Sequence, residues 1–367
     1  MKKFKSFLML CSIIFIASCA LQMVDASKEA MADSNYHNWV VLGYKAASYA
    51  KRALGESYGL IVLTNAGYAE VNGQSTLAVV DGITRSMPVS LGDKTLLIVH
   101  SSVFSPLWFA FYDPSSGNCA YLELISDAVK DKTNFLTLPP SIFKGPVVER
   151  IDAQYVIDNE AEIDQKISQK VFGGNEFRII TIANAAAVGV PDYVINSALF
   201  HDHYCPGVTS GILIANWAKK NFAPFPGGGY FVHGVDPWCK EDALQVMFNT
   251  TPGKKGYAVS YPSSENKAKW KEEVKNASTI LYRENPSTKQ WEGVVLGFTF
   301  SKNTGCESIK SGTVSRLCQD LWYLNYLDTP EQFVSKLHSF TLPSGKTPQD
   351  LARPGVDPMK ELGLTNP

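Results

Sequence analysis

The chain has 367 residues, of which 45% are hydrophobic and 19% charged, and its 34 Lys and Arg against 35 Asp and Glu leave a formal net charge of −1. This apolar content excludes a disordered or fibrous chain. The balanced charge gives no support for a nucleic-acid partner, which requires an excess of positive charge. The length predicts one large or two ordinary domains whose cores need no disulfide scaffold.

The first residues, 1–19, have the pattern of a secretory leader: three lysines precede an apolar run at 7–16 that is too short to span a membrane. The run ends in Ile-Ala-Ser-Cys, which resembles the bacterial lipobox, so we predict Cys19 as a lipid anchor and the protein as a periplasmic or cell-surface lipoprotein. The alternative is soluble secretion after cleavage near residues 24–26. Attachment to the membrane is expected only through this anchor, because no second apolar run approaches the ~20 residues of a spanning helix.

Two stretches of the exported part share their spacing. His37 lies six residues before Gly43, as Cys205 does before Gly211. Further along, 81 and 242 are both Asp, each with a Gly eight residues before it and another eleven residues after it. Similar strand-like runs and turns follow in both. Such self-similarity predicts a duplicated structural unit.

We therefore predict an α+β chain with two related copies of one unit. The expected divisions are a leader at 1–19, a first copy at 33–150, a connecting segment at 151–195, a second copy at 196–350, and a loosely packed tail at 351–367.

The second copy contains metal-ligand residue types that the first copy lacks. The candidate ligands are His201, His203, Cys205 and Cys239. The aligned positions of the two thiols in the first copy are His37 and Ala78. If residues 201–205 are extended, the alternate side chains lie on one side of the chain and can converge on an ion. Imidazole and thiolate together suit zinc and its neighbours nickel, cobalt and copper.

Each of these two thiols also comes directly before a predicted helix. Pro206 is a typical first-turn residue after Cys205, and residues 240–244 continue from Cys239. A helix N-terminus stabilises the thiolate, which is the form that binds metal or attacks an electrophile. The alternative is that the two histidines end a surface helix and that both thiols are buried apolar residues. His233, after a Gly-rich turn, could also reach the site, although a loop role is the commoner one.

The remaining thiols of the exported part are expected to have structural roles. Cys306 and Cys318 bracket a stretch that lengthens the second copy, and in an exported protein we expect them to form a loop-closing disulfide; the alternative is a free pair. Cys119 lies in a strand-like run and is expected in the core.

The second copy resembles the FmdE family, which takes its name from formylmethanofuran dehydrogenase. The resemblance rests on His-Asp-His-Tyr-Cys-Pro-Gly at 201–207, Cys-Lys-Glu-Asp-Ala-Leu-Gln at 239–245 and Thr-Pro-Gly-Lys at 251–254. Two features depart from the family pattern: Asp202 replaces the usual glycine, and the closely spaced Cys pairs of an appended zinc finger are absent from the sequence.

The resemblance implies an α+β core with a metal site, carried here by His203, Cys205 and Cys239, with His201 as a further candidate. It also implies pairing of this core, since family members form dimers of it. The two copies would thus form an intramolecular pseudo-dimer, with further oligomers open. Formylmethanofuran chemistry is not transferred to this chain, because fold does not carry function.

Three functions follow as hypotheses. The first is an exported protein that binds one transition-metal ion, with zinc preferred over nickel or cobalt. The second is an enzyme, with Cys205 as a thiolate nucleophile and His201 or His203 as its base, or with metal-activated water. The third is a protein that binds a metal-bearing tetrapyrrole such as haem. The sequence identifies no oriented catalytic triad. Asp242 could orient a histidine, but since both copies keep this Asp we expect it to have the same structural role as Asp81.

Overall fold

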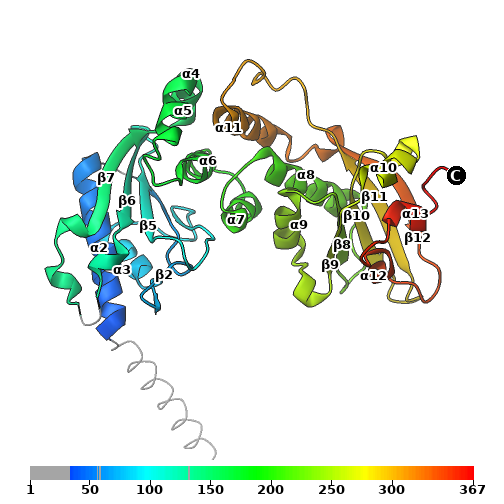
Figure 1. Cartoon of the computed structure of the whole chain (residues 1–367), viewed down its shortest axis with the longest axis horizontal. Helices are drawn as coiled ribbons and strands as arrows, with labels where there is room; N and C mark the ends of the chain where they lie inside the picture. Colours follow the sequence, from blue (N-terminus) through cyan, green and yellow to red (C-terminus); the bar gives the residue numbers. More distant parts are fainter. Residues whose placement is uncertain (1–33, 56, 58, 131–132) are drawn as a thin grey trace, which may run out of the picture.

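The computed structural model describes residues 34–55, 57, 59–130 and 133–367 (Figure 1). The predicted leader and the candidate lipid anchor Cys19 lie outside the described residues. The described chain forms two five-stranded mixed sheets with helices packed on them and a group of helices between them. The predicted α+β class is therefore confirmed. Among the described helices, none combines the length and apolar character needed to cross a bilayer.

The first sheet lies in the N-terminal half and has the strand order β4-β1-β5-β6-β7. β1 and β4 pair in parallel, whereas all other neighbours are antiparallel. The aromatic strand β5 is buried on both faces: Phe109 and Phe111 belong to the core under α2 and α3, and Trp108 and Tyr112 to the core shared with the central helices. The elements of this half are α2 (Ser34–Leu54), β1 (Ile61–Thr64), β2 (Glu70–Val71), β3 (Gln74–Ser75), α3 (Val79–Ser86), β4 (Leu96–Ile98), β5 (Trp108–Tyr112), β6 (Asn118–Leu124) and β7 (Phe143–Arg150).

The second sheet lies in the C-terminal half and has the strand order β9-β8-β10-β11-β12. β8 and β9 pair in parallel and the remaining neighbours are antiparallel. The elements of this half are α8 (Pro206–Asn221), β8 (Tyr230–Val235), α9 (Lys240–Phe248), β9 (Tyr257–Ser260), α10 (Ser264–Lys269), β10 (Ala277–Glu284), β11 (Trp291–Phe298), α11 (Gly312–Tyr323), β12 (Val334–Thr341), α12 (Pro348–Leu351) and α13 (Pro358–Glu361).

Both halves have the same topology. In each, a long helix precedes a strand, a second helix leads to a parallel neighbour, and three antiparallel strands follow. The two helices also cross at equivalent glycines: a Cβ on Gly43 would lie 2.0 Å from the carbonyl oxygen of Val79, and one on Gly211 would lie 2.3 Å from that of Lys240. Only glycine allows backbones to approach so closely. A duplicated unit would have this arrangement, and duplication itself stays a prediction.

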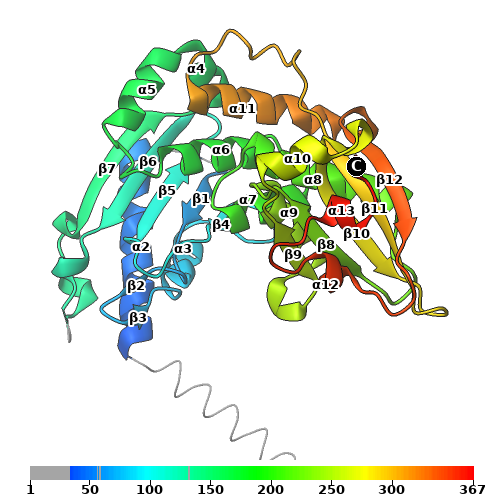
Figure 2. The ribbon, with the colours of Figure 1, turned by 45° about the vertical axis from the view of Figure 1, so that its right-hand side comes forward.

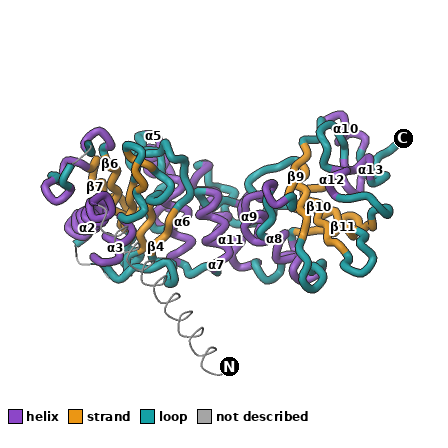
Figure 3. The backbone as a smooth tube through the Cα atoms, turned by 90° about the horizontal axis from the view of Figure 1, so that it is seen from below, coloured by secondary structure: helices purple, strands orange, loops and turns teal. Residues whose placement is uncertain are grey.

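Four helices connect the two halves: α4 (Ala153–Asp158), α5 (Glu160–Ser168), α6 (Glu176–Ala187) and α7 (Asp192–His201). α11, from the C-terminal half, returns to pack on α4, α5 and α6. Figures 2 and 3 show α6, α7 and α11 between the two groups of strands. One cluster of buried apolar side chains runs through these helices from the first sheet to the second.

The C-terminal tail is packed rather than loose, contrary to the expectation from its prolines. Met359 is fully buried and Leu364 nearly so, and both belong to a core with Tyr282 on the face of the second sheet that α8 and α9 leave open. Thr365 also forms a bridge with Trp270. Burial of apolar side chains offsets the lack of helical periodicity here.

Candidate metal centre

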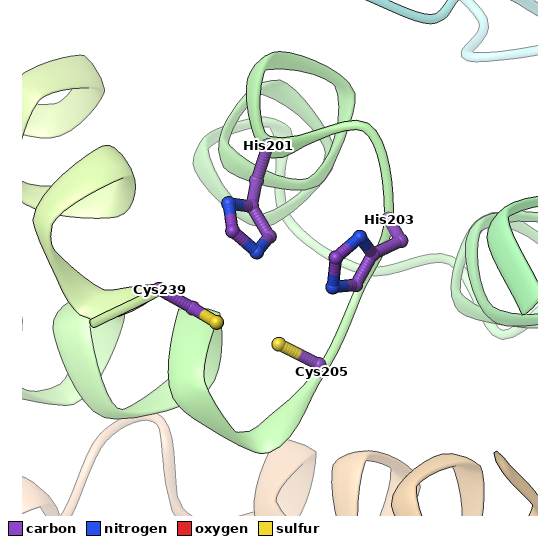
Figure 4. Close-up of side chains that lie close together, drawn as sticks. All are labelled: His201, His203, Cys205 and Cys239. Atoms are coloured by element: carbon purple, nitrogen blue, oxygen red, sulfur yellow. The ribbon is translucent and has the colours of Figure 1, made fainter.

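The four candidate ligands come together between α7, α8 and α9. One ligand atom from each of His201, His203, Cys205 and Cys239 lies within 4.8 Å of all the others. Figure 4 shows both imidazole rings and both sulfur atoms pointing toward a common centre. In the described part of the chain no other group of three or more His, Cys, Asp or Glu residues is placed to hold an ion.

The convergence does not arise from an extended segment, so that part of the prediction is wrong. α7 continues to His201, and Asp202 then turns the chain with a left-handed φ of 71°. Asp adopts this conformation more readily than most residues, and it suits glycine best, which accounts for the glycine of the family pattern. His203 follows in the loop, and Cys205 is extended, with φ −152° and ψ 162°, as the N-cap of α8.

Both thiols lie at helix N-termini, as expected. Cys205 precedes α8, which begins with Pro206, and Cys239 is the N-cap of α9. The two helix ends meet because residue 207 is glycine: a Cβ on Gly207 would lie 2.7 Å from Cys239 Cβ and 3.1 Å from Cys239 Sγ. The crossing of α8 and α9 thus brings the two sulfur atoms together across 34 residues of sequence.

A carboxylate orients each histidine. His201 Nδ1–H donates to Asp242 Oδ2 at 2.6 Å, and His203 Nδ1–H donates to Asp202 Oδ1 at 2.7 Å. Asp202 is itself held by Arg178 Nη2 at 2.6 Å. Both rings therefore direct Nε2 toward the centre, and His201 Nε2 is buried with no hydrogen-bond partner. Metal-ligating histidines characteristically donate their other ring N–H to a carboxylate in this way.

Asp242 was expected to repeat the structural role of Asp81, and this expectation is wrong. Asp81 accepts a hydrogen bond from Tyr36 Oη at 2.6 Å, whereas Asp242 contacts His201. Equal spacing in the two halves therefore concealed a difference in partner, since the partner of Asp81 comes from α2 and that of Asp242 from α7.

The residues of the cluster change one another's pKa values. Burial alone would lower the pKa of His201, but the hydrogen bond to Asp242 and the nearby Cys239 thiol outweigh it and raise the pKa to about 9. The hydrogen bond from the Cys205 thiol is the largest cause that lowers the pKa of Cys239, and His201 and His203 lower it further. The same bond, together with burial, raises the pKa of Cys205.

The donor set fits a transition-metal ion. Two thiolates and two imidazoles are the Cys2His2 set of tetrahedral zinc sites. The unpartnered, buried Nε2 of His201 gives a second reason, since a buried nitrogen without a partner is costly unless something binds it. These residues suggest metal binding, and the donors alone do not identify the metal.

Other candidates from the sequence lie outside the cluster. His233 is fully buried in β8, and its Nε2 lies 2.7 Å from Ser260 Oγ. It shares the strand face of Phe231 and Val235, which pack under the C-terminal tail, so strand alternation directs it away from the ligands. Cys119 is a free, buried thiol of the first sheet.

Cys306 and Cys318 form a disulfide with an S–S distance of 2.06 Å. It ties the segment after β11 to α11. Sequence reasoning missed the contribution of α11 to the surroundings of the site, because no local signal brings a helix back across the molecule.

Residues 200–311 match the model of the family described as FmdE, Molybdenum formylmethanofuran dehydrogenase operon. The matched region contains all four candidate ligands, both helices that carry the thiols and four strands of the second sheet, and it excludes the first sheet. The C-terminal half of the chain is thus similar to this family. A search of curated proteins found no match to the chain.

Proposed function

We propose that this chain is an exported protein that binds one transition-metal ion through His201, His203, Cys205 and Cys239. The observation that carries the proposal is the convergence of four donor groups within 4.8 Å, with the histidine Nε2 atoms facing the centre. Zinc is the first candidate because its borderline-soft character suits a mixed nitrogen and sulfur set. Nickel and cobalt are the alternatives.

The N-terminal half would serve as the structural partner of the site. In the equivalent positions it has His37 and Ala78, which cannot reproduce the pair of thiolates. The site is therefore expected to be single and asymmetric, with one ion per chain. Enzymatic use of the site and binding of a metal-bearing tetrapyrrole stay predictions of the sequence.

Metal analysis of the purified protein tests the proposal. The wild-type protein, prepared under reducing conditions without chelator, is compared with Cys205→Ser, Cys239→Ser and the control Cys119→Ala, which removes a buried thiol elsewhere. We expect about one ion per chain in the wild type and the control, and a loss in both site variants. A wild type without metal, or site variants that keep it, would contradict the proposal.

The leader carries the second part of the proposal, export with a lipid on Cys19. Metabolic labelling with a fatty acid tests it in cells that express the full chain. We expect label on the wild type and on Cys11→Ser, which alters the other thiol of the leader, and none on Cys19→Ser. Equal labelling of Cys19→Ser and wild type would exclude the anchor.

A further inference from the structure

A pocket of about 390 Å³ lies directly beside the candidate metal centre. Three of the four candidate ligands line it: His203, Cys205 and Cys239. His201 does not line it. An ion held by these residues would thus present one side to the pocket. The volume is at the small end of the range of about 300–1,000 Å³ that is usual for ligand pockets.

Two aromatic side chains form an apolar wall. Trp238 is 58% exposed, and its ring lies 5.9 Å from that of Phe300 in an edge-to-face arrangement. The Trp238 backbone N–H donates to Glu241 Oε2 at 2.6 Å, which fixes the chain at this position. A large aromatic ring held in place yet exposed beside a pocket offers apolar area to a ligand.

A second wall comes from α11 and is cationic. Arg316 and Gln319 are one turn apart on this helix and both line the pocket. The Arg316 guanidinium lies 5.7 Å from the centre of the Phe177 ring, and among the described residues it forms no ion pair. Asp320, which follows on the same helix, is fully buried and accepts a hydrogen bond from Thr209 Oγ1 at 3.0 Å. The charge of Arg316 acts on Asp320 through space, but within the described chain no carboxylate pairs with it directly, so its N–H groups can meet a ligand.

The charges in the lining of the pocket favour an anionic ligand. A divalent ion with two thiolates and two neutral imidazoles has no net charge. The carboxylates that orient the histidines, Asp202 and Asp242, do not line the pocket. Arg316 therefore supplies a full positive charge to its wall, and the N-terminus of α8, at Pro206 and Gly207, adds the positive end of a helix dipole. Arg is well suited to bind a planar carboxylate through paired hydrogen bonds.

We propose that this pocket binds a small organic monocarboxylate next to the metal ion, with its acid group on Arg316 and its apolar body against Trp238 and Phe300. The inference rests on the metal centre of the proposed function. The disulfide between Cys306 and Cys318 would stabilise the pocket, because it ties the segment that follows Phe300 to the helix that carries Arg316.

Titration of the cobalt-loaded full chain tests the proposal. The probe is benzoate, whose ring suits the aromatic wall, and the matched control is benzamide, which has the same shape without the charge. The visible absorption of cobalt reports the metal site, and calorimetry of the zinc-loaded chain reports binding directly. We expect saturable binding of benzoate and binding of benzamide at least tenfold weaker.

Variants separate the contributions of the two walls. Arg316→Gln is expected to weaken benzoate binding at least tenfold, and Trp238→Ala at least threefold, while both keep the cobalt bands. Arg52→Gln, an exposed arginine of the first half, should leave binding unchanged. Cobalt bands without benzoate binding by either method, or equal affinity in Arg316→Gln, would overturn the pocket proposal alone. Absence of cobalt bands in the wild type would overturn the metal centre instead.

Discussion

Replacement of Gly207 by alanine perturbs the metal centre through packing alone. The added Cβ would lie 2.7 Å from Cys239 Cβ and 3.5 Å from Trp238 Cδ2. Carbon atoms in contact prefer about 3.5–4.0 Å, so Cys239 has to retreat by about 1 Å. Metal–ligand distances tolerate only about 0.2 Å. The cysteine therefore cannot both avoid the new methyl group and keep its place at the ion.

The cost falls on metal binding rather than on folding. In the metal-free protein the start of α9 can shift so that Cys239 Cβ moves away from the methyl group, whereas metal binding requires it to return. Overpacking of this kind costs about 1–3 kcal/mol. At 1.4 kcal/mol for each tenfold change, Gly207→Ala should raise the dissociation constant of zinc roughly fivefold to 150-fold. Folding should change less, since alanine is up to about 1 kcal/mol better than glycine within a helix.

Competition with a chromophoric chelator measures the affinity, and thermal unfolding of the metal-free chain measures the stability. Gly43→Ala is the matched control, because its Cβ would lie 2.0 Å from the carbonyl oxygen of Val79 in the half without ligands. It should lower stability and leave zinc affinity unchanged. Gly229→Ala, with no atom within 4 Å of the new Cβ, should change neither. Wild-type zinc affinity in Gly207→Ala would refute the reasoning.

Three further outcomes are expected. Asp242→Asn should weaken zinc binding about 10–100-fold, because His201 loses the carboxylate that orients it. The same chelator competition measures the zinc affinity, and an unchanged affinity would show that the carboxylate does not have this role. Loss of the disulfide in the double variant Cys306→Ser/Cys318→Ser should lower the free energy of unfolding by about 3 kcal/mol, the value expected for a sequence separation of 12. Chemical denaturation measures this difference, and an equal denaturation midpoint for the variant and the wild type would contradict it. Burial lowers the pKa of His233 to about 4, so as the pH falls the unfolded chain takes up a proton on this residue before the folded chain does. The contribution of His233 to the free energy of unfolding should be complete above about pH 6.5 and decrease toward pH 4 by on the order of 3 kcal/mol, as measured by denaturation at a series of pH values. An equally steep decrease in His233→Gln would assign the pH dependence to other groups.

Local chemistry in the sequence was enough to identify the candidate ligands and the fold class. A thiol followed by proline or by Lys-Glu-Asp marks a helix start from neighbouring residues alone. The matched spacing of glycine and aspartate predicted two similar α+β units, and both sheets have one topology. These inferences succeed because helix capping and apolar periodicity depend on residues within a few positions of each other.

The sequence did not identify contacts between residues that are distant along the chain. The contact of His201 with Asp242 spans 41 residues, and Arg316 reaches the site from a helix more than a hundred residues further along the chain than Cys205. The expectation of an extended segment at 201–205 was wrong for a local reason, since α7 continues to His201 and Asp202 turns the loop.

The sequence by itself thus determined the donor atoms, the helix starts at the two thiols and the α+β class. The tertiary structure decided which carboxylates orient the histidines, that His233 faces the other side of its sheet, and that α11 closes a cationic pocket beside the site. The physical reason is that donor chemistry belongs to single side chains, whereas their convergence depends on how closely α8 and α9 cross, which Gly207 and Gly211 allow only once the helices are packed.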